Sequence, residues 1–489
     1  MRLAVVIHLV GVLVRLFGLM VFLPALVAAL YHEWTDAAGF LATALGTLAL
    51  GEGMRMAGGP RSQAAAERLR RVEGMSVVAG TWILMAHVAA VPYIWAGLGF
   101  IDALFESMSG LTTTGATVFR DFAAFGRGIF FWRSMTQWLG GMGVIALFVA
   151  VLPRLAIGGR ELFFAEASGP TDEKLTPQIR QTAMVLWRLY AVLTAAEVIA
   201  LLGAGMSLFD AVCHAMTTLA AGGFSPNPAS LAGYSPAVQW VILVFMVLAG
   251  VNFALQVRVA RGGHGRALLH DEEFRAYLGA ILVATVLLVP FLMVNGTSLA
   301  AAIRHGLFQA VSIITTTGYA SEDFNLWSDQ AKVVLLALMF IGGSAGSAAG
   351  GPKVVRHVLM ARYTLRELRR TLHPRAVLPV KLGGRVVPDQ TMREVVVFML
   401  FYILTFAVGA TIVIALGADL VTGITASAAT IGNVGPGFSA VGPMGHFADL
   451  HPISKIVLTL EMWIGRLEVL TVLVLFRGEI WRSARWQSE

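Results

Sequence analysis

Long apolar stretches recur along the whole chain, and they limit its possible folds more than any other feature. A helix that crosses the hydrocarbon layer of a membrane needs about 20 mostly apolar residues. Ten stretches approach that length, at roughly 3–30, 37–54, 74–97, 128–152, 183–205, 236–257, 276–294, 331–360, 391–416 and 453–476. The composition agrees, because only 13% of the residues are charged, against about 25% in soluble proteins. We therefore predict an all-α polytopic membrane protein.

Basic residues are distributed unevenly between the connections. Most of the 36 Lys and Arg residues gather in alternate connections, at Arg2, Arg55 to Arg71, Arg154 to Arg180, Arg258 to Arg275, Lys353 to Arg393 and after Arg477. The positive-inside rule makes that face cytoplasmic, together with both termini. The net charge of +7 follows from this bias. Basic segments beside membrane spans meet anionic lipid headgroups, so we expect no nucleic-acid partner.

Four outward-facing connections carry a shorter apolar segment that ends in small residues. These segments are Asp102 to Thr114, Ser207 to Ala221, Ser298 to Thr317 and Asp419 to Val434. A short helix followed by irregular backbone between two spans is typical of a re-entrant loop, which is tolerated at membrane depth where it lines an aqueous path. Asp102 and Ser298 stand where N-caps of such helices belong. The segments recur about every hundred residues, which indicates a fourfold internal repeat.

The small-residue tails have the composition of a cation site. They read TTTGA from Thr112, LAAGGF from Leu219, TTTGY from Thr315 and GNVGP from Gly432. Glycine adopts the positive φ values that an inward-facing ladder of carbonyls requires, and a ring of carbonyls can replace the water around a cation. Each preceding helix points its partly negative C-terminal end at the same place. Helix packing through small residues is the alternative, but four such tails favour a pore.

The eighth apolar stretch is interrupted by GGSAGSAAGGP, from Gly342 to Pro352. Each interior glycine costs a helix about 1 kcal/mol relative to alanine. We therefore predict an unwound loop near the inner half of the membrane. A nucleotide-binding loop is disfavoured, because Pro352 separates Gly351 from Lys353, whereas that motif needs Gly-Lys-Ser/Thr in succession.

Arg466 lies within the last apolar stretch. A guanidinium there needs a partner or water, so an intramembrane arginine is a candidate functional residue. A structural ion pair with Glu461 or Glu468 is the alternative interpretation, and the two roles are compatible.

Together these motifs resemble the Trk/Ktr/HKT superfamily of potassium transporters, and specifically its TrkH-type pore subunits of bacterial potassium uptake. The resemblance rests on SGLTTTGAT (Ser109 to Thr117), WRSMTQWLGGMG (Trp132 to Gly143), GGFS (Gly222 to Ser225), TTGY (Thr316 to Tyr319), IGGSAGS (Ile341 to Ser347) and GRLE (Gly465 to Glu468).

The resemblance implies four pseudo-symmetric helix–pore-loop–helix repeats around a central ion pathway, plus an N-terminal transmembrane helix pair. The expected units are 1–71 for the helix pair, then 72–182, 183–275, 276–388 with the gate loop, and 389–489. The implied function is potassium-selective translocation across the bacterial inner membrane, with K⁺ as substrate and no covalent cofactor. A sodium-permeable or sodium/proton-coupled potassium symporter of the same fold stays open as the alternative.

The resemblance also implies the residues that bind K⁺ and those that form the gate. The selectivity filter maps onto Thr113, Thr114, Gly115, Ala220, Ala221, Gly222, Thr316, Thr317, Gly318, Asn433, Val434 and Gly435. The gate maps onto Gly342, Gly343, Ser344, Gly346, Ser347, Gly350, Gly351 and Arg466. Ala220 and Ala221 carry no hydroxyl, so the expected filter is not fourfold in its side chains.

Members of the superfamily are implied to be homodimers in the lipid bilayer that bind a cytosolic nucleotide-binding regulatory subunit of the TrkA type. The basic stretch from Arg356 to Arg385 is a docking surface for that subunit or, equally, a lipid-facing loop. An intramembrane enzyme is not expected, because the sequence has no HExxH pattern and its apolar stretches carry only scattered histidines such as His8 and His87. A purely structural scaffold would leave the glycine-rich interruptions unexplained.

Overall fold

The computed structural model describes residues 1–59, 62, 69–150, 175–262, 266–294, 296–469 and 472. Over these residues the chain is helical apart from one antiparallel hairpin, in which β1 (Lys381–Leu382) pairs with β2 (Arg385–Val386). The all-α prediction is confirmed. Several expected segments lie partly outside the described residues: 151–152 of the span at 128–152, 154–174 of the basic segment, 470–471 and 473–476 of the last span, and the basic residues from Arg477 onward.

The bundle is built from long helices. They are α1 (Leu3–Met20), α2 (Phe22–Leu30), α3 (Trp34–Gly58), α5 (Arg71–Trp95), α7 (Arg127–Ala150), α10 (Leu175–Gly203), α15 (Glu272–Val294) and α19 (Asp389–Ala415). Within the described residues, 6 helical spans are long and apolar enough to cross a membrane, with α1 and α2 counted as one. Helix α7 is not among them, because Arg133, Thr136 and Gln137 make it more polar; all three are buried.

The predicted continuous span at 236–257 is wrong. Helices α12 (Pro236–Ala249) and α13 (Phe253–Ala260) are bent by 101° at a break, and they form a seventh span only if the pair is counted as one. Gly250 ends α12, and the Asn252 side chain starts α13 by accepting the N–H of Ala254 at 2.8 Å. A helix cap placed inside an apolar stretch therefore overrides its hydropathy. The short α14 (Arg266–His270) follows.

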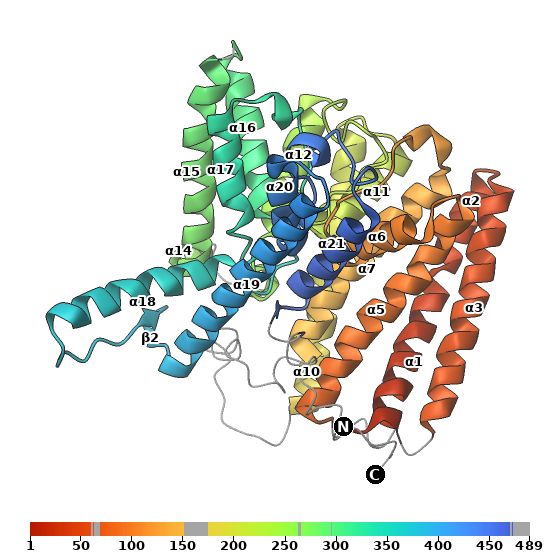
Figure 1. Ribbon diagram of the computed structural model, residues 1–489, viewed down its shortest axis with the longest axis horizontal. Coiled ribbons are helices and arrows are strands. Elements are labelled where there is room, and N and C mark those ends of the chain that lie inside the picture. Colours follow the sequence, from red (N-terminus) through yellow and green to blue (C-terminus); the bar gives the residue numbers. More distant parts are fainter. Residues whose placement is uncertain are drawn as a thin grey trace.

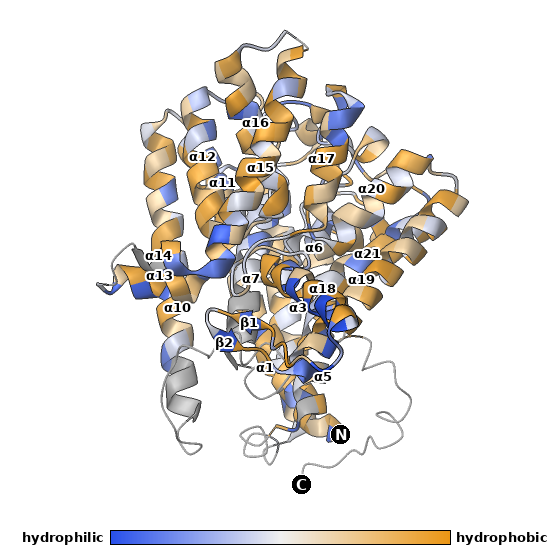
Figure 2. Cartoon of the chain, turned by 90° about the vertical axis from the view of Figure 1, so that its left-hand side faces the viewer, coloured by the Kyte–Doolittle hydropathy of each residue, from blue (hydrophilic) through white to orange (hydrophobic). Residues whose placement is uncertain are grey.

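The predicted unwinding of the eighth stretch is confirmed. Helix α17 (Asp329–Met339) ends before the glycine-rich segment, and α18 (Val354–Leu372) begins after it. Helix α18 leaves the bundle sideways at the lower left of Figure 1. Its hydrophilic residues stand out in blue against the mostly orange bundle helices in Figure 2. The last described helix is α21 (Pro452–Arg466).

Four short helices correspond to the four re-entrant segments: α6 (Phe100–Leu111), α11 (Leu208–Leu219), α16 (Leu299–Ile314) and α20 (Leu420–Ile431). Three 3₁₀ turns follow three of them: η2 (Phe122–Ala124), η3 (Phe324–Leu326) and η4 (Ser439–Val441). Ser298 caps α16 as predicted, by accepting the N–H of Ala301. Asp102 does not cap α6, because Gly99 is the N-cap and Asp102 lies in the first turn, where it pairs with Lys455.

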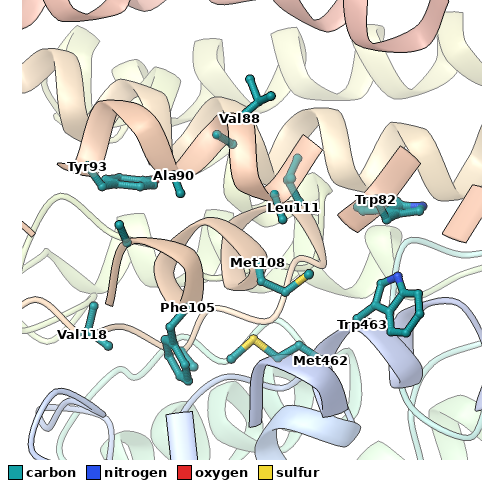
Figure 3. Close-up of a cluster of buried hydrophobic side chains, with 14 of the residues drawn as sticks. Trp82, Val88, Ala90, Tyr93, Phe105, Met108, Leu111, Val118, Met462 and Trp463 are labelled. Atoms are coloured by element: carbon teal, nitrogen blue, oxygen red, sulfur yellow. The ribbon is translucent and has the colours of Figure 1, made fainter. Parts of the chain in front are cut away.

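The largest hydrophobic cluster joins the beginning of the chain to its end. Figure 3 shows Tyr93 and Trp82 of α5 above Phe105 and Met108 of α6, with Met462 of α21 beside Phe105 and below Met108. The last helix thus packs against the first short helix. This contact places α6, α11, α16 and α20 around a common centre rather than in an open row. Helices α1 and α3 pack together at the outer edge beside α5 (Figure 1).

Candidate functional site

Each of the four short helices ends in the same turn. We name the segments that follow tail 1 (112–115), tail 2 (220–223), tail 3 (315–318) and tail 4 (432–435). The second residue of each tail has a left-handed backbone: Thr113 (φ 52°), Ala221 (φ 54°), Thr316 (φ 56°) and Asn433 (φ 53°). The fourth residue is a glycine with positive φ: Gly115 (86°), Gly223 (72°), Gly318 (78°) and Gly435 (104°). Four different sequences therefore adopt one backbone path.

The third residue of each tail donates its N–H back into its own helix. The bonds are Thr114 to Ser109 O (2.8 Å), Gly222 to Thr217 O (2.8 Å), Thr317 to Ser312 O (2.9 Å) and Val434 to Ala429 O (2.8 Å). These bonds satisfy carbonyls that a helix C-terminus leaves without partners. They also fix the direction in which each tail leaves its helix.

Tail 2 is one residue out of register with our assignment from sequence. Ala221, Gly222 and Gly223 occupy the positions of Thr113, Thr114 and Gly115, whereas Ala220 is the C-cap of α11. The predicted set of Ala220, Ala221 and Gly222 is corrected accordingly. The sequence contains two adjacent glycines, and only the backbone dihedrals show that Gly223 matches the glycine of the other tails. The lack of hydroxyls in tail 2 is unaffected.

The four glycines pack against four carbonyl groups in a closed ring. A Cβ atom on Gly115 would collide with the carbonyl oxygen of Gly222, one on Gly223 with that of Thr317, one on Gly318 with that of Val434, and one on Gly435 with that of Thr114. The order is tail 1 to 2 to 3 to 4 and back to 1. Each tail thus offers a carbonyl to one neighbour and a glycine to the other, and all four meet at one point.

Side-chain oxygens surround the ring in three of the four tails. The hydroxyls of Thr112 and Thr114 are 2.8 Å apart, as are those of Thr315 and Thr317. Asn433 of tail 4 donates from Nδ2 to the Thr114 hydroxyl at 2.9 Å, which joins the first and last tails. All five side chains are completely buried.

Tail 2 is held by Gln137, which lies within the motif WRSMTQWLGGMG but received no individual role from the sequence. Gln137 on α7 donates from Nε2 to Gly222 O at 2.7 Å and accepts the N–H of Phe224 at Oε1, at 3.1 Å. A buried amide on a membrane helix therefore replaces the contacts that hydroxyls make in tails 1 and 3. Its position in the polar run of α7 was the available signal.

The glycine-rich segment, 342–351, forms a loop that packs against the broken span. Gly342, Gly346 and Gly351 have positive φ values of 80°, 71° and 71°. The loop is joined to the α12–α13 break by three backbone bonds: Ser344 N to Gly250 O (2.9 Å), Ala348 N to Ala249 O (3.2 Å) and Phe253 N to Gly346 O (3.1 Å). Two further bonds close it on itself, from Ser347 Oγ to Ser344 O (2.6 Å) and from Val354 N to Gly343 O (3.0 Å).

The loop lies directly against tails 3 and 4. Gly350 donates its N–H to the Thr316 hydroxyl at 2.6 Å. A Cβ atom on Gly350 would lie 2.7 Å from Gly432 O and 2.9 Å from the Cβ of Asn433. The loop and the ring are therefore in direct contact.

Arg466 ends α21 beside this loop and is 6% exposed. Its Nη1 donates to Ala348 O at 3.0 Å, while Nε and Nη2 make no hydrogen bond to any described residue. The ion-pair interpretation is wrong: Glu461 accepts from the hydroxyls of Ser427 and Thr430 instead. Glu468 pairs with Arg356 at 2.6 Å. Arg466 thus contributes a positive charge at the loop that no described carboxylate neutralises.

A helical bundle with membrane-length spans, in which four short helices end in tails that meet in one buried ring, defines a multi-span helical membrane protein. The family model TrkH, described as "Cation transport protein", matches residues 56–483. The chain belongs to the TrkH family, whose members are ion transporters and not enzymes.

Individual relatives match along nearly the whole chain. The Trk system potassium uptake protein TrkH of Salmonella typhimurium is 38% identical over 97% of this chain and 99% of its own length. The protein of the same name from Vibrio parahaemolyticus is 40% identical over 98% and 99%. The crystal structure of the potassium transporter TrkH from Vibrio parahaemolyticus superposes with a TM-score of 0.89 and 36% identity, covering 99% of this chain and 100% of that one.

Proposed function

We propose that this chain moves K⁺ across the membrane through the ring of four tails. The observation that carries the proposal is the closed circuit of glycine and carbonyl contacts, because a ring of backbone carbonyls can replace the hydration shell of a monovalent cation. The names of the relatives, potassium uptake proteins, support K⁺ as the ion. Those relatives are bacterial, which supports the inner membrane as its location. The uneven distribution of Lys and Arg between the connections supports a cytoplasmic position for both termini.

The proposed selectivity filter comprises three residues of each tail. They are Thr113, Thr114 and Gly115; Ala221, Gly222 and Gly223; Thr316, Thr317 and Gly318; and Asn433, Val434 and Gly435. Backbone oxygens serve in all four tails, whereas hydroxyl ligands are available only in tails 1 and 3. The filter is thus fourfold in backbone but not in side chains.

The loop at 342–351 and Arg466 form the proposed gate below this filter. A buried guanidinium opposes a permeating cation by Coulomb repulsion, which is strong in a low-dielectric interior. Helix α18 starts directly after the loop, and Arg356 on α18 pairs with Glu468, two residues after Arg466. A force on α18 would therefore reach the loop and the arginine together.

This linkage supports a cytosolic nucleotide-binding regulatory subunit that docks on the basic stretch from Arg356 to Arg385. Arg369, Arg370 and Arg385 in that stretch are exposed. We also propose that two copies of the chain form a homodimer.

Growth of a bacterium that lacks its own potassium-uptake systems tests the proposed function. The chain should restore growth at limiting K⁺, and Gly318→Ala, at equal membrane abundance, should not. Failure of the unaltered chain to restore growth, in a host that supplies a regulatory subunit, would contradict the proposal.

A further inference from the structure

The irregular segment that follows each tail is tied back to the short helix that precedes the tail. The tie starts from a side chain seven residues before the left-handed residue of the tail, and these side chains are Glu106, His214 and Gln309. Its partner lies a few residues after that left-handed residue, and these partners are Thr117 with Val118, Ser225, and Ser321. At tail 4 the neighbouring Thr425 accepts the N–H of Phe438 instead, at 2.9 Å.

The tie at tail 1 is the one built from a carboxylate. Glu106 accepts the N–H of Val118 at 2.8 Å and the Thr117 hydroxyl at 3.1 Å. At tail 3 the amide of Gln309 does the equivalent work by accepting the N–H of Ser321 at 3.1 Å. A neutral glutamine side chain therefore fits this position and can hold the segment after the tail. The negative charge of Glu106 must then serve another purpose.

Arg133 on α7 explains that charge. Its Nε donates to Glu106 at 2.8 Å, its Nη2 to the Thr117 hydroxyl at 3.1 Å, and its Nη1 to Ser225 O at 3.2 Å. Glu106 is 0% and Arg133 2% exposed. The guanidinium also lies 4.0 Å from the ring centre of Phe224. The Arg133 side chain thus bridges the segments that follow tails 1 and 2.

The bridge is close to the ring of tails. Thr117 and Ser225 stand two residues after Gly115 and Gly223, the glycines that pack tail 1 on tail 2 and tail 2 on tail 3. The positive charge of Arg133 would repel a cation in the ring unless a nearby negative charge balanced it. Removing one partner of such a buried ion pair is strongly unfavourable.

We propose that Arg133 and Glu106 are positioning residues for the ion pathway. Arg133 sets the separation of the segments that follow tails 1 and 2. Glu106 balances the positive charge of Arg133, so that the permeating cation is not repelled. The inference rests on the proposed function of the ring, and it assigns a charge-balance role that neither the tails nor the gate supplies.

A charge-balance series in proteoliposomes tests the inference. Glu106→Gln keeps the shape and leaves Arg133 unpaired, so K⁺ flux should fall at least about tenfold and the K⁺ concentration for half-maximal flux should rise. Glu106→Gln combined with Arg133→Gln removes both charges, so flux should return to within about threefold of the unaltered chain. The preference for K⁺ over Na⁺ should stay lower, because the bonds of the guanidinium to Thr117 and Ser225 are lost. A double variant as impaired as the single one would overturn the inference, as would an unimpaired Glu106→Gln variant.

A second variant separates position from charge. Arg133→Lys keeps the charge but reaches fewer of the three partners, because an ammonium lacks the planar fork of a guanidinium. The K⁺ concentration for half-maximal flux should stay near that of the unaltered chain, while the preference for K⁺ over Na⁺ should fall. An unchanged preference would overturn the positioning role. If neither the unaltered chain nor the Arg466→Ala variant carries K⁺ in these vesicles, the proposed function fails, an outcome distinct from failure of the Glu106 and Arg133 variants alone.

Discussion

The ring of tails and the loop beneath it both depend on glycine, but they use it differently. In the ring, four sequences that share few side chains adopt one backbone, and each glycine admits a carbonyl of the next tail. In the loop, one glycine-rich segment occurs once, on one side, and is held by bonds to α12, to Thr316 and to Arg466. Under the proposed function, ion recognition would need all four tails, whereas a single asymmetric segment would serve as the gate.

The largest effect is expected from adding a side chain inside the ring. Gly318→Ala and Gly115→Ala place a Cβ against the carbonyls of Val434 and Gly222 at φ values of 78° and 86°. We expect the preference for K⁺ over Na⁺ to fall at least about tenfold, because a distorted carbonyl ring fits the ion less well. Flux measured with each ion in turn is the readout. Gly279→Ala on α15, where a Cβ meets nothing within 4 Å, is the control. An unchanged preference for K⁺ over Na⁺ in both ring variants would show that the ring is not the selectivity filter.

The second prediction sharpens the register of tail 2. Gly223→Ala should resemble Gly318→Ala, because its Cβ meets the backbone carbonyl of Thr317 at a positive φ. Gly222→Ala should be milder, since its Cβ meets only the end of the Gln137 side chain, and Gln137→Ala should relieve it. The ratio of K⁺ flux to Na⁺ flux in each variant is the readout. If Gly222→Ala were the more damaging change, the register inferred from sequence would be right after all.

The third prediction concerns the asymmetric side of the comparison. Arg466→Ala should raise K⁺ flux several-fold without changing the ion preference, because it removes an unneutralised charge and the bond to Ala348 O. Arg188→Ala on α10, where the side chain is exposed, controls for the loss of an arginine as such. At equal protein content, flux at or below that of the unaltered chain would show that Arg466 does not obstruct the path.

Sequence predicted the architecture because each part left a local pattern. Apolar stretches marked the membrane helices, and the glycine run at 342–351 marked the unwound loop. The break at Gly250 also left a signal, a glycine followed shortly by Asn252, but the surrounding hydropathy concealed it. An apolar stretch indicates that its residues avoid water, but it does not show that they form one continuous helix. A capped break inside such a stretch is therefore easily missed.

Contacts between distant segments were not predictable in the same way. Glu106 and Arg133 lie on different helices, and no periodicity relates them. The partner of Arg466 is a backbone carbonyl from the loop, whereas sequence proximity favoured two glutamates. Any residue supplies a carbonyl, so the identity of such a partner leaves no trace in the sequence.

The smallest effect is expected at the entrance to a short helix. Asp419 caps α20 by accepting the N–H groups of Val421 and Thr422, both at 3.0 Å. Asp419→Ala should lower stability by about 1 kcal/mol, and Asp419→Asn should be nearly neutral, because asparagine is an equally good cap. Thermal unfolding in detergent at pH 7 measures both.

Acid should weaken the same cap. The hydrogen bond from the Thr422 side chain holds the pKa of Asp419 below its ordinary value. A depressed folded-state pKa means that the carboxylate's contribution is present above the unfolded pKa and is lost as the pH falls through the folded one. The unaltered chain and Asp419→Asn should therefore be nearly equal in stability at pH 7, and the unaltered chain should become the less stable of the two as the pH falls. A constant difference would mean that the carboxylate charge contributes nothing to the cap.

The central claim is that the four tails together select K⁺, and ion competition tests it most directly. Rubidium uptake would be measured into liposomes that contain the purified chain, with K⁺ or Na⁺ added as competitor, alongside Arg466→Ala to provide an open gate. The account predicts that K⁺ suppresses uptake at concentrations where Na⁺ does not. Equal suppression by the two ions, or no uptake by either form, would contradict it.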